Sequence, residues 1–415
     1  MKIAIVGTGI SGLVAAYHLA PHHEITVFEA GNHVGGHTHT HQVTSHGRDY
    51  AIDTGFIVFN DWTYPHFIAL MEQLEVRFIE STMSFSVRCE KTGLEYNGTS
   101  LDALFSQRQN LLSPRFFRML MDIFRFNREA PRLLDEDDDG LTLGDYLDRE
   151  GYSQPFRDHY ILPMGSAIWS QAPDGMLKFP VQNFIRFFSN HGMLSVSNRP
   201  TWRVIQGGST SYVTPLINQF KDAIRLNTPV ESIRREGHQV LVTSPAAASE
   251  AFDCVVMACH SDQALALLSD PSPLEREILG AIPYQENEVV LHTDSRVLPK
   301  AKKAWAAWNY HIPSKTSDRV AVTYNMNILQ RLEADETFCV SLNHSAYIDP
   351  QKIIKRLTYH HPVFTDAGIK AQQRHGEISG ISQTYYAGAY WGYGFHEDGV
   401  KSGLRVVEQI AALAQ

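Results

Sequence analysis

The chain has 415 residues, of which 43% are hydrophobic and 20% charged, so it is a folded globular protein long enough for two or three domains. Its formal net charge of −9 excludes a nucleic-acid reader, which needs concentrated lysine and arginine. The four cysteines, Cys89, Cys254, Cys259 and Cys339, form no C-x-x-C pair, which predicts buried structural thiols in a reducing compartment.

The N-terminal stretch, residues 3–23, contains no Asp, Glu, Lys or Arg and so resembles a membrane span or a signal peptide in its hydropathy. "KIAIVG" is instead typical of a short β-branched strand, and Gly7, Gly9 and Gly12 interrupt the apolar run with a turn. We therefore expect a cytoplasmic protein.

"KIAIVGTGISGLVAAYHLA" predicts a buried strand, a tight turn and a helix, and "EITVFEA" predicts a second strand, which together make a βαβ unit. Gly7 allows the sharp turn, Gly9 lets the backbone approach a pyrophosphate, and Gly12 lets helix and strand pack closely. The helix N-terminus offers free N–H groups to the phosphates. Glu29 ends the second strand 22 residues after Gly7, where a carboxylate can accept hydrogen bonds from an adenosine ribose.

The following stretch, "GNHVGGHTHTHQ", raises the question of a metal. His37, His39 and His41 alternate, and an extended chain would place them on one face at intervals of roughly 7 Å, where they could converge on zinc. No carboxylate or cysteine accompanies them at a recognised ligand spacing. We therefore predict no metal site.

The order of Glu29, Gly35, Gly36, Asp53 and Gly55 resembles the flavin enzymes of the amine oxidase, protoporphyrinogen oxidase and phytoene desaturase superfamily. In that superfamily the pair of glycines follows the ribose acid as "E-x(5)-G-G-R", and a "D-x-G" comes later. The resemblance implies that FAD is the cofactor. One departure is that His37 stands at the position of the usual arginine, so a fixed charge on the phosphate is lost or depends on histidine protonation.

The C-terminal stretch "TYYAGAYWGYGFHEDGVKSGLRVVEQIAAL" predicts a strand, an aromatic-glycine loop and a helix opening near Asp398. It resembles the closing motif of the superfamily, although Asp398-Gly399 stands where Gly-Ala is usual. A helix beginning there would aim N–H groups at the flavin pyrimidine and favour the anionic reduced flavin. No cysteine stands nearby, so we expect the FAD to be bound non-covalently.

The resemblance implies that Gly36 and its successors run along the FAD diphosphate, that residues 55–57 approach the isoalloxazine, and that the backbone of Val230 meets adenine. The predicted FAD-binding residues are Gly7, Gly9, Ser11, Gly12, Glu29, Ala30, Gly35, Gly36, His37, Thr38, Gly55, Phe56, Ile57, Val230, Trp391, Glu397, Asp398 and Gly399.

The predicted fold is α/β, with an amine-oxidase-like arrangement of two discontinuous domains. Residues 1–75, 200–264 and 376–415 are expected to form a Rossmann-like FAD-binding domain, and residues 76–199 and 265–375 an α+β substrate or cap domain. Because no second G-x-G-x-x-G occurs, a separate nicotinamide domain is not expected. Electrons would then come from the substrate and leave to oxygen, a quinone or a carrier protein.

Two aromatic helices are predicted in the cap domain. One starts after Pro180 and stops at Gly192, with Phe184, Phe187 and Phe188 on one face, for which core packing is favoured over a substrate tunnel.

The other helix lies within residues 113–134. Arg115, Arg118, Asp122 and Arg125 share one of its faces, and Phe116, Met119, Leu120, Ile123 and Phe124 fill the remainder. Such a helix could rest on an anionic membrane surface, but packing on its own domain is favoured. "DEDDDG" at 135–140 is predicted to be a solvated loop, because it lacks the spacing of a calcium site.

Within the superfamily, "LPMGSAIWS", "NHGML", "WRVIQGGSTSY" and "YWGYGFHEDG" resemble a subgroup of predicted NAD/FAD-binding amine oxidoreductases. Relatives of this subgroup occur beside, or fused to, cyclopropane fatty acid synthases, which implies acyl chains as candidate substrates. Amine oxidases of this fold carry a lysine in a substrate-domain strand, whereas the comparable "NEVVLHTD" offers Asn287 or Glu288. The absence of this lysine argues against ordinary amine oxidation.

We therefore expect an FAD-dependent oxidoreductase, of oxidase, dehydrogenase or desaturase type, acting on a hydrophobic substrate such as an unsaturated or branched fatty acyl chain. The alternatives are an amine or polyamine oxidase, a flavin-dependent double-bond isomerase, and a non-catalytic lipid-binding or partner-binding protein of the GDP-dissociation-inhibitor type. No catalytic residue is predicted firmly. Candidate substrate contacts are Asn60, Tyr310, Tyr324 and Tyr393, and candidate bases are His311, Tyr310, Tyr324 and His396.

Overall fold

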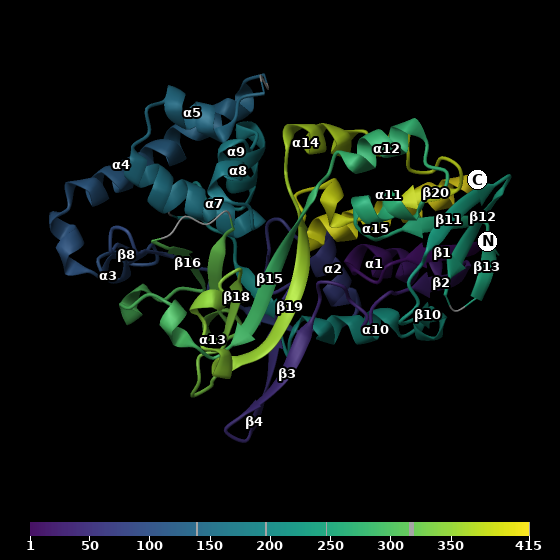
Figure 1. Cartoon of the computed structure of the whole chain (residues 1–415), viewed down its shortest axis with the longest axis horizontal. Helices are drawn as coiled ribbons and strands as arrows, with labels where there is room; N and C mark the ends of the chain where they lie inside the picture. Colours follow the sequence, from purple (N-terminus) through teal and green to yellow (C-terminus); the bar gives the residue numbers. More distant parts are fainter. Residues whose placement is uncertain (138–139, 196, 246, 315–318, 415) are drawn as a thin grey trace.

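A computed structural model describes residues 1–137, 140–195, 197–245, 247–314 and 319–414. One end of the molecule is built on a five-stranded parallel sheet in the order β10-β2-β1-β14-β20 (Figure 1). Its strands are β1 (Lys2–Val6), β2 (Glu24–Phe28), β10 (Ile224–Arg225), β14 (Cys254–Met257) and β20 (Thr384–Tyr386). The sheet is therefore assembled from stretches that are far apart in the sequence.

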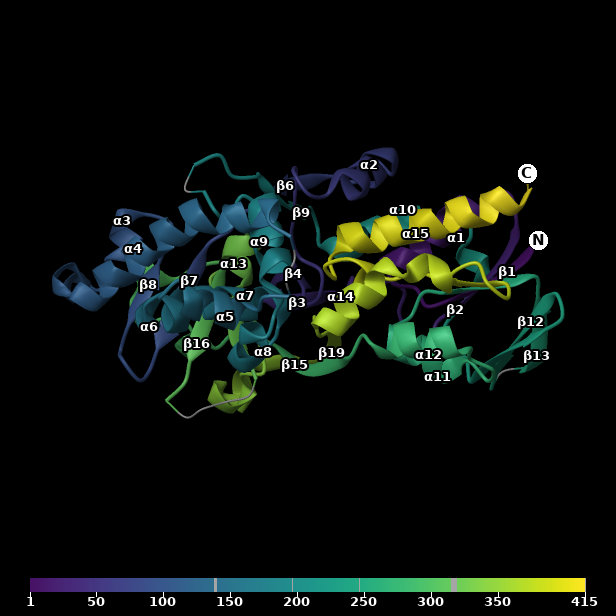
Figure 2. The same ribbon diagram turned by 90° about the horizontal axis from the view of Figure 1, so that it is seen from above.

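Alternate residues of β1 enter two different cores, as the two-residue period of a strand requires. Ile3 and Ile5 pack with α1 (Ile10–Leu19) and α15 (His396–Ala411), which lie side by side (Figure 2). Ala4 and Val6 pack with β11 to β13 and with α11 and α12. The sheet is covered on both faces, which is why β1 and β14 read as continuous apolar runs.

The other end is built on a seven-stranded sheet in the order β19-β15-β18-β17-β16-β7-β8. The helices α4 to α9 pack on it around one large core. Its two longest strands, β15 (Tyr284–His292) and β19 (Ile353–Pro362), are antiparallel neighbours that run between the two halves of the molecule (Figure 1). Both chain termini lie at the far end, beside the parallel sheet (Figures 1 and 2).

The remaining elements have the following bounds. The strands are β3 (Thr40–Ser45), β4 (Arg48–Asp53), β5 (Phe59–Asn60), β6 (Phe78–Glu80), β7 (Phe85–Cys89), β8 (Glu95–Asn97), β9 (Trp202–Ile205), β11 (Ser232–Glu236), β12 (Gln239–Ser244), β13 (Ala247–Phe252), β16 (Trp308–Ile312), β17 (Ala321–Asn325) and β18 (Cys339–Leu342). The helices are α2 (Pro65–Gln73), α3 (Leu101–Leu104), α4 (Pro114–Glu129), α5 (Leu143–Arg149), α6 (Gln154–Phe156), α7 (Leu162–Trp169), α8 (Pro173–Leu177), α9 (Val181–Asn190), α10 (Val213–Ile217), α11 (Ser261–Leu267), α12 (Pro273–Gly280), α13 (Met326–Leu329) and α14 (Asp366–Gln373).

Most predicted helices are present, with shifted ends. The C-terminal helix begins at His396, two residues before the predicted Asp398, and α9 covers the predicted aromatic helix with Phe184, Phe187 and Phe188 buried. The predicted strand "FDCVVMAC" is divided at Asp253, whose carboxylate accepts a hydrogen bond from the backbone N–H of Lys2 at 2.7 Å.

Two side chains of α4 depart from a simple division into an exposed charged face and a packed apolar face. Asp122 is buried, and its carboxylate accepts a hydrogen bond from the Ser153 backbone N–H at 3.0 Å. Phe124 is 62% exposed rather than packed against the domain. The predicted loop "DEDDDG" follows, and Asp135 is exposed, whereas residues 138–139 lie outside the described residues. Within the described parts of the chain, every helix is too short or too polar to span a bilayer.

Candidate functional site

A cavity of about 730 Å³ begins at the carboxyl ends of β1, β2 and β14 and continues to the seven-stranded sheet. Ligands of parallel α/β sheets bind in the crevice at this edge. The cavity is lined by residues 6–11, 28–30, 35–37 and 228–230 at one end, and by side chains of α7 and of the strands β15 to β19 at the other. We call these the nucleotide end and the substrate end.

Three glycines shape the nucleotide end. A Cβ at Gly12 would lie 2.1 Å from the Gly7 carbonyl oxygen, and a Cβ at Gly7, whose φ is +106°, would lie 2.7 Å from the Ala258 carbonyl oxygen. A Cβ at Gly9 would meet no atom within 4 Å, because Gly9 faces the cavity at the start of α1. This space beside a helix N-terminus fits a diphosphate, whose charge the free N–H groups stabilise. Ser11, in the first turn of α1, also lines the cavity.

Glu29 lies at the same end, held by the turn itself. Its Oε2 accepts hydrogen bonds from the Thr8 backbone N–H at 3.0 Å and from the Thr8 hydroxyl, and its Oε1 accepts one from the Gly31 N–H at 2.8 Å. The predicted neighbours Ala30 and Val230 line the cavity as well. Sequence reasoning missed Thr8, although its place between Gly7 and Gly9 identifies it as part of the turn.

The second pair of glycines lies against the first motif. Gly35 and Gly36 have φ values of +128° and +59°, and a Cβ at Gly36 would lie 3.1 Å from the Cα of Gly9. A Cβ at Gly55 would lie 2.0 Å from the His37 carbonyl oxygen, which accepts the Phe56 N–H at 2.8 Å. Close backbone approach therefore requires glycine at these positions.

Asp53 holds this part of the backbone in place from outside the cavity. Its buried carboxylate accepts hydrogen bonds from the Thr40 hydroxyl, from the N–H and hydroxyl of Ser209, and from the Gln330 amide. Burial raises the pKa of Asp53 to about 6, against the lowering effect of Thr40 and Ser209. Asp53 does not line the cavity and therefore positions the backbone that does.

His37 presents an unpaired polar atom to this site. Its Nε2 is buried without a hydrogen-bond partner, and its ring lies 4.8 Å from that of Tyr359 and 5.6 Å from that of His361. Burial, together with His260 and His360, lowers the pKa of His37 to about 4. The imidazole is neutral near pH 7 and can offer the diphosphate a hydrogen bond rather than the fixed charge of an arginine.

His37, His39 and His41 do not share one face, as they would in an extended chain. His39 stacks with His33 and contacts His41, with ring centroids 4.1 Å apart in both pairs, whereas His37 turns into the cavity. The reason is that β3 begins only at Thr40, so the preceding backbone is not extended. Among the residues that the structure describes, no group of three or more His, Cys, Asp or Glu side chains could hold a metal ion.

The start of α15 also lies against the cavity. The buried ring of His396 stacks on Phe56, with centroids 3.5 Å apart, and its Nε2 lies 3.0 Å from both the Thr38 and Tyr212 hydroxyl oxygens. Phe56, Ile57 and His396 line the cavity, whereas Thr38 stands behind them.

Four further predicted residues do not line the cavity. Glu397 accepts hydrogen bonds from the N–H groups of His66 and Phe67, and Asp398 accepts those of Tyr393 and Phe395. Both acids therefore anchor the helix start. Trp391 packs edge-on against His375, and Gly399 lies against Ile10.

The substrate end is lined mainly by apolar side chains. They are Val58, Ile168, Trp169, Val289, Trp308, Tyr324, Leu342, Phe364, Tyr393 and Phe395. Among the described residues, Glu29 at the opposite end is the one carboxylate that lines the cavity, and no lysine or arginine does. The substrate end therefore combines a largely apolar wall with the polar side chains that β19 contributes, Tyr359, His360 and His361.

Of the four predicted substrate contacts, Tyr324 and Tyr393 line this end. Asn60 instead holds a turn, because its Oδ1 accepts the N–H groups of Trp62 and Thr63 at 2.9 Å. Tyr310 is buried in the core next to the cavity without lining it.

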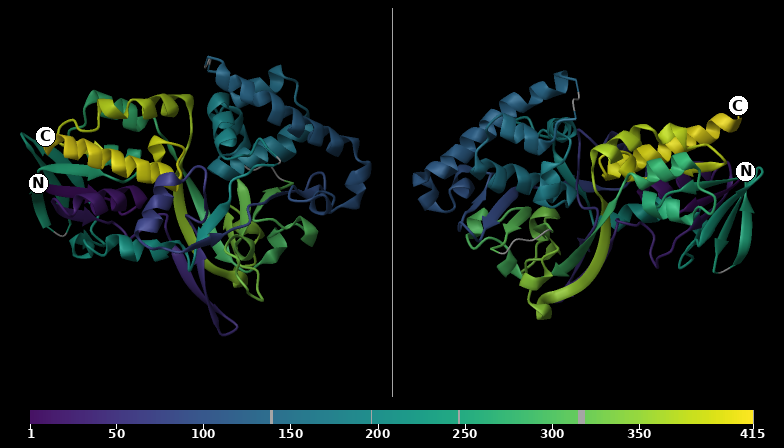
Figure 3. Two further views of the ribbon diagram at one scale, coloured as in Figure 1. Left: turned by 180° about the vertical axis from the view of Figure 1, so that it is seen from behind. Right: turned by 45° about the horizontal axis from the view of Figure 1, so that its top comes forward.

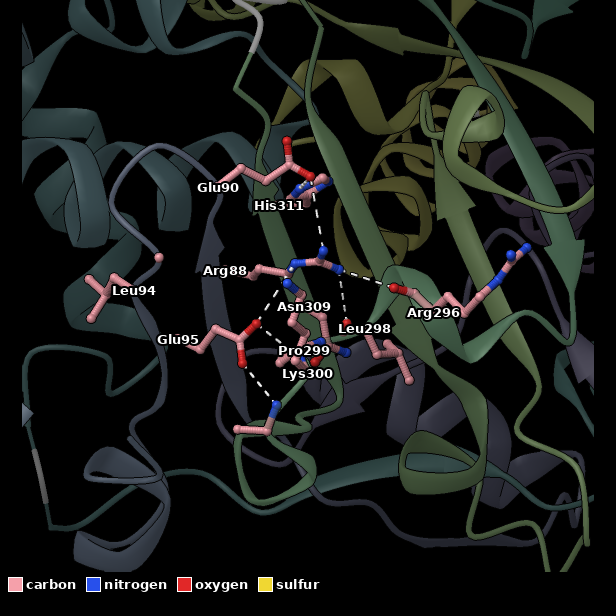
Figure 4. A network of polar contacts seen from close by, with 12 residues as sticks. Arg88, Glu90, Leu94, Glu95, Arg296, Leu298, Pro299, Lys300, Asn309 and His311 are labelled. Atoms are coloured by element: carbon pink, nitrogen blue, oxygen red, sulfur yellow. Dashed lines mark hydrogen bonds and ion pairs between the residues drawn. The ribbon is translucent and has the colours of Figure 1, made fainter. Parts of the chain in front are cut away.

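The candidate base His311 belongs to a separate polar network. Its Nδ1 lies 2.7 Å from Nε2 of His344 and its Nε2 lies 3.1 Å from Glu90. Figure 4 shows His311 beside Arg88, which donates to the Leu298 carbonyl oxygen at 3.1 Å. These groups do not line the cavity, since successive residues of a strand point to opposite faces of the sheet.

Sequence reasoning missed His361, the polar group best oriented at the substrate end. The Asn343 amide donates to Asn287 Oδ1 at 2.8 Å, which turns the Asn287 Nδ2 toward His361 Nδ1 at 3.1 Å. Nδ1 then accepts, so Nε2 carries the proton. Neither Asn287 nor Glu288 lines the cavity, whereas Val289 of the same strand does. The only signal for His361 was the "YHHP" stretch in a predicted cap segment.

Comparison with solved structures shows the same fold over almost the whole chain. Cyclohexylamine oxidase from Brevibacterium oxydans IH-35A superposes with a TM-score of 0.71 at 15% identity, over 100% of this chain and 99% of that one. A putative protoporphyrinogen oxidase from Exiguobacterium sp. 255-15 gives 0.70 at 18% identity over 100% and 99%. A CLA-producing fatty acid isomerase from P. acnes gives 0.69 at 17% identity, over 98% of each chain. No curated protein sequence matches the chain.

The family comparison agrees with the geometry of the nucleotide end. The model for flavin containing amine oxidoreductases matches residues 10–327, which is more than half of the chain. FAD is the cofactor, and the open space at Gly9 and the unpaired Nε2 of His37 are the features that would accommodate its diphosphate. The chain belongs to the flavin-containing amine oxidoreductase family and is an FAD-dependent oxidoreductase.

Proposed function

We propose that the substrate is a hydrophobic molecule, and specifically an unsaturated or branched fatty acyl chain. The observation that carries this proposal is the lining of the substrate end, where ten aromatic or aliphatic residues surround the space and no carboxylate, lysine or arginine of the described chain faces it. An acyl chain is stabilised there by the apolar area it removes from water. A polyamine would bring a cationic group to a site without a carboxylate, at a desolvation cost.

FAD, when bound, supplies the capacity to accept a hydride. The protein holds the acyl chain beside the flavin, and Trp169, Val289, Trp308 and Leu342 exclude water from it. The electrons leave to oxygen, a quinone or a carrier protein.

His361 is the group we propose to donate a hydrogen bond to the substrate. Its Nδ1 is occupied by Asn287, so the Nε2–H is the atom available to the cavity. Burial, with His37 and His360, lowers the pKa of His361 to about 3, so the ring is neutral at physiological pH. A neutral imidazole can donate a hydrogen bond to an oxygen of the acyl substrate without carrying a permanent charge into the apolar site.

A double-bond isomerase is the second candidate. Like the oxidation, it requires an apolar binding site that holds the acyl chain beside the flavin. It differs in that the hydride returns to another carbon of the chain, so no external electron acceptor is consumed. The likeness in fold to the fatty acid isomerase, at 17% identity, supports this candidate without deciding between the two.

The test uses the FAD-loaded full-length protein under anaerobic conditions with a panel of unsaturated and branched acyl substrates. Net oxidation predicts bleaching of the flavin absorbance without an added acceptor, whereas isomerisation predicts a shifted double bond in the product by mass spectrometry with the flavin absorbance restored. A parallel panel of amines is read by peroxide release in air. Peroxide from an amine together with inert acyl substrates would overturn the proposal.

A cellular comparison complements the assay. Lipids extracted from cells with and without the protein are compared by mass spectrometry, and the proposal expects a changed profile of acyl-chain unsaturation or branching. An unchanged profile removes acyl chains as substrates.

A further inference from the structure

Helix α4 has two apolar faces, of which only one is covered. Phe116, Met119 and Phe126 are at most 3% exposed and pack in the core of the seven-stranded-sheet region. Phe117, Met121 and Phe124, spaced i, i+4 and i+7, lie on the opposite side and are 42%, 58% and 62% exposed. Packing of this domain accounts for the buried apolar face of α4. It leaves the second apolar face exposed to water.

Three further exposed apolar side chains lie in the residues before the helix. Leu101 of α3 is 76% exposed, and Leu111 and Leu112, which immediately precede α4, are 48% and 89% exposed. We call Leu101, Leu111, Leu112, Phe117, Met121 and Phe124 the α4 apolar surface. Large exposed apolar groups that gather in one place mark an interaction site, whereas single ones need no explanation.

The stretch that carries this surface is rich in arginine although the chain as a whole has a net charge of −9. Residues 101–134 contain six arginines against three carboxylates, and one of the three, Asp122, is buried between Arg118 and Arg125. Arg115 is exposed and has no ion-pair partner among the described residues. The acidic run that starts at Asp135 follows the C-terminal end of α4, whereas Leu111 and Leu112 precede the N-terminal end. The two ends of this 16-residue helix are about 24 Å apart.

We propose that the α4 apolar surface docks on an anionic lipid bilayer, with Phe117, Met121 and Phe124 among the acyl chains and the arginines at the headgroup phosphates. An apolar strip with basic flanks is the pattern of a helix that lies in the plane of a membrane surface. A second copy of the chain fits less well, because a two-fold interface would place one arginine-rich rim against the other.

The position of α4 in the molecule agrees with docking. The helix lies at the end farthest from the termini and the parallel sheet, as the two views of Figure 3 show. It packs on α6, and the chain continues from there into α7, whose Trp169 lines the substrate end of the cavity. Docking does not depend on which substrate the cavity takes.

The test is cosedimentation of the full-length, FAD-loaded protein with vesicles of phosphatidylcholine with and without phosphatidylglycerol. We expect binding to the anionic vesicles that weakens at high salt. The variant F117S/M121S/F124S should bind about 100-fold more weakly, because three apolar side chains no longer enter the bilayer. The matched control L274S/I354S/I381S removes three exposed apolar side chains elsewhere and should bind as the wild type does.

Retained flavin absorbance and an unchanged unfolding temperature show that the triple variant is folded. Should it lose its flavin, Leu112→Asp gives the same comparison at a side chain that is 89% exposed. The proposal is overturned if the wild type stays in solution with anionic vesicles, or if the variants bind as tightly as the wild type. It is also overturned if the surface proves to join two copies, seen as a wild-type dimer and a monomeric triple variant in sedimentation velocity.

Discussion

The two ends of the cavity are built on different principles. At the nucleotide end the backbone makes the site, so that a Cβ at Gly12 or Gly55 would lie 2.1 or 2.0 Å from a carbonyl oxygen. At the substrate end side chains make the site, contributed by α7 and by five strands, β15 to β19, together with the segments that follow them. The comparison teaches that close backbone approach restricts residue type severely, whereas an apolar wall accepts many residues of similar volume.

Gly9→Val should have the largest effect, because it fills the space left for the diphosphate without touching the protein. A Cβ at Gly9 meets no atom within 4 Å, so the FAD-free variant should fold with an unchanged unfolding temperature. We expect no flavin to copurify and FAD affinity to fall by more than about 1,000-fold, since bulky atoms exclude the phosphates from the helix N-terminus. Titration calorimetry measures the affinity.

The matched control is Gly98→Val, because Gly98 also has open space around its Cβ position and lies outside the cavity. Normal flavin loading of Gly9→Val would show that the nucleotide end has been placed wrongly.

Val289→Trp should impair the substrate end and leave the nucleotide end unchanged. Val289 is fully buried in the protein and lines the substrate end, so an indole there occupies the space of the substrate. We expect turnover of the acyl substrate to fall about 100-fold while flavin absorbance is retained. The smaller variant Val289→Ala should keep turnover within about tenfold, and equal losses in both would argue against a filled cavity.

The sequence predicted the nucleotide end well because close backbone approach allows few residue types there. For the same reason, we expect substitutions at the nucleotide end to have severe effects. Gly7, Gly9, Gly12 and Glu29 lie close together in the chain, so their spacing alone defines the turn, and all but Gly12 reach the cavity. Glu397 and Asp398 were predicted as FAD contacts from a linear motif, but their carboxylates instead hold backbone N–H groups.

The substrate end could not be predicted to the same degree. His361 and Val289 face one cavity because β15 and β19 pair as antiparallel neighbours, and this register is a tertiary property. Tyr310 and His311 were both plausible from the sequence, yet neither lines the cavity. A strand's period of two tells which residues share a face, but the packing of the sheet decides which face meets the ligand.

Glu29→Gln should weaken FAD binding without abolishing it. A charged acceptor contributes about 1.5–3 kcal/mol per hydrogen bond, so loss of its charge should weaken FAD binding by about 10- to 100-fold. Glu24→Gln, at the exposed start of the same strand, is the control and should bind FAD normally. An unchanged dissociation constant for Glu29→Gln would exclude contact between this carboxylate and the ribose.

His37→Asn should produce the smallest effect, a change in how the stability of the FAD-free protein depends on pH. Burial, with His260 and His360, lowers the pKa of folded His37 to about 4, whereas the unfolded side chain titrates near 6.5. Between these values the unfolded state binds the extra proton, so the free energy of unfolding falls as the pH falls. One such proton corresponds to at most about 1.4 kcal/mol per pH unit, which the variant should lack.

The pH dependence of the free energy of unfolding should be compared between wild type and His37→Asn. The comparison is needed because other groups contribute to this pH dependence with the opposite sign. Burial raises the pKa of Asp53 and that of Asp398 to about 6, so these carboxyls bind protons more readily in the folded state and favour it as the pH falls below that value. Both remain in the variant and cancel in the comparison. With FAD bound, the diphosphate charge favours protonated His37, so the difference between the two proteins should shrink. Equal pH slopes for the two FAD-free proteins would show that His37 does not titrate inside the cavity, and a difference that FAD leaves unchanged would place the diphosphate away from it.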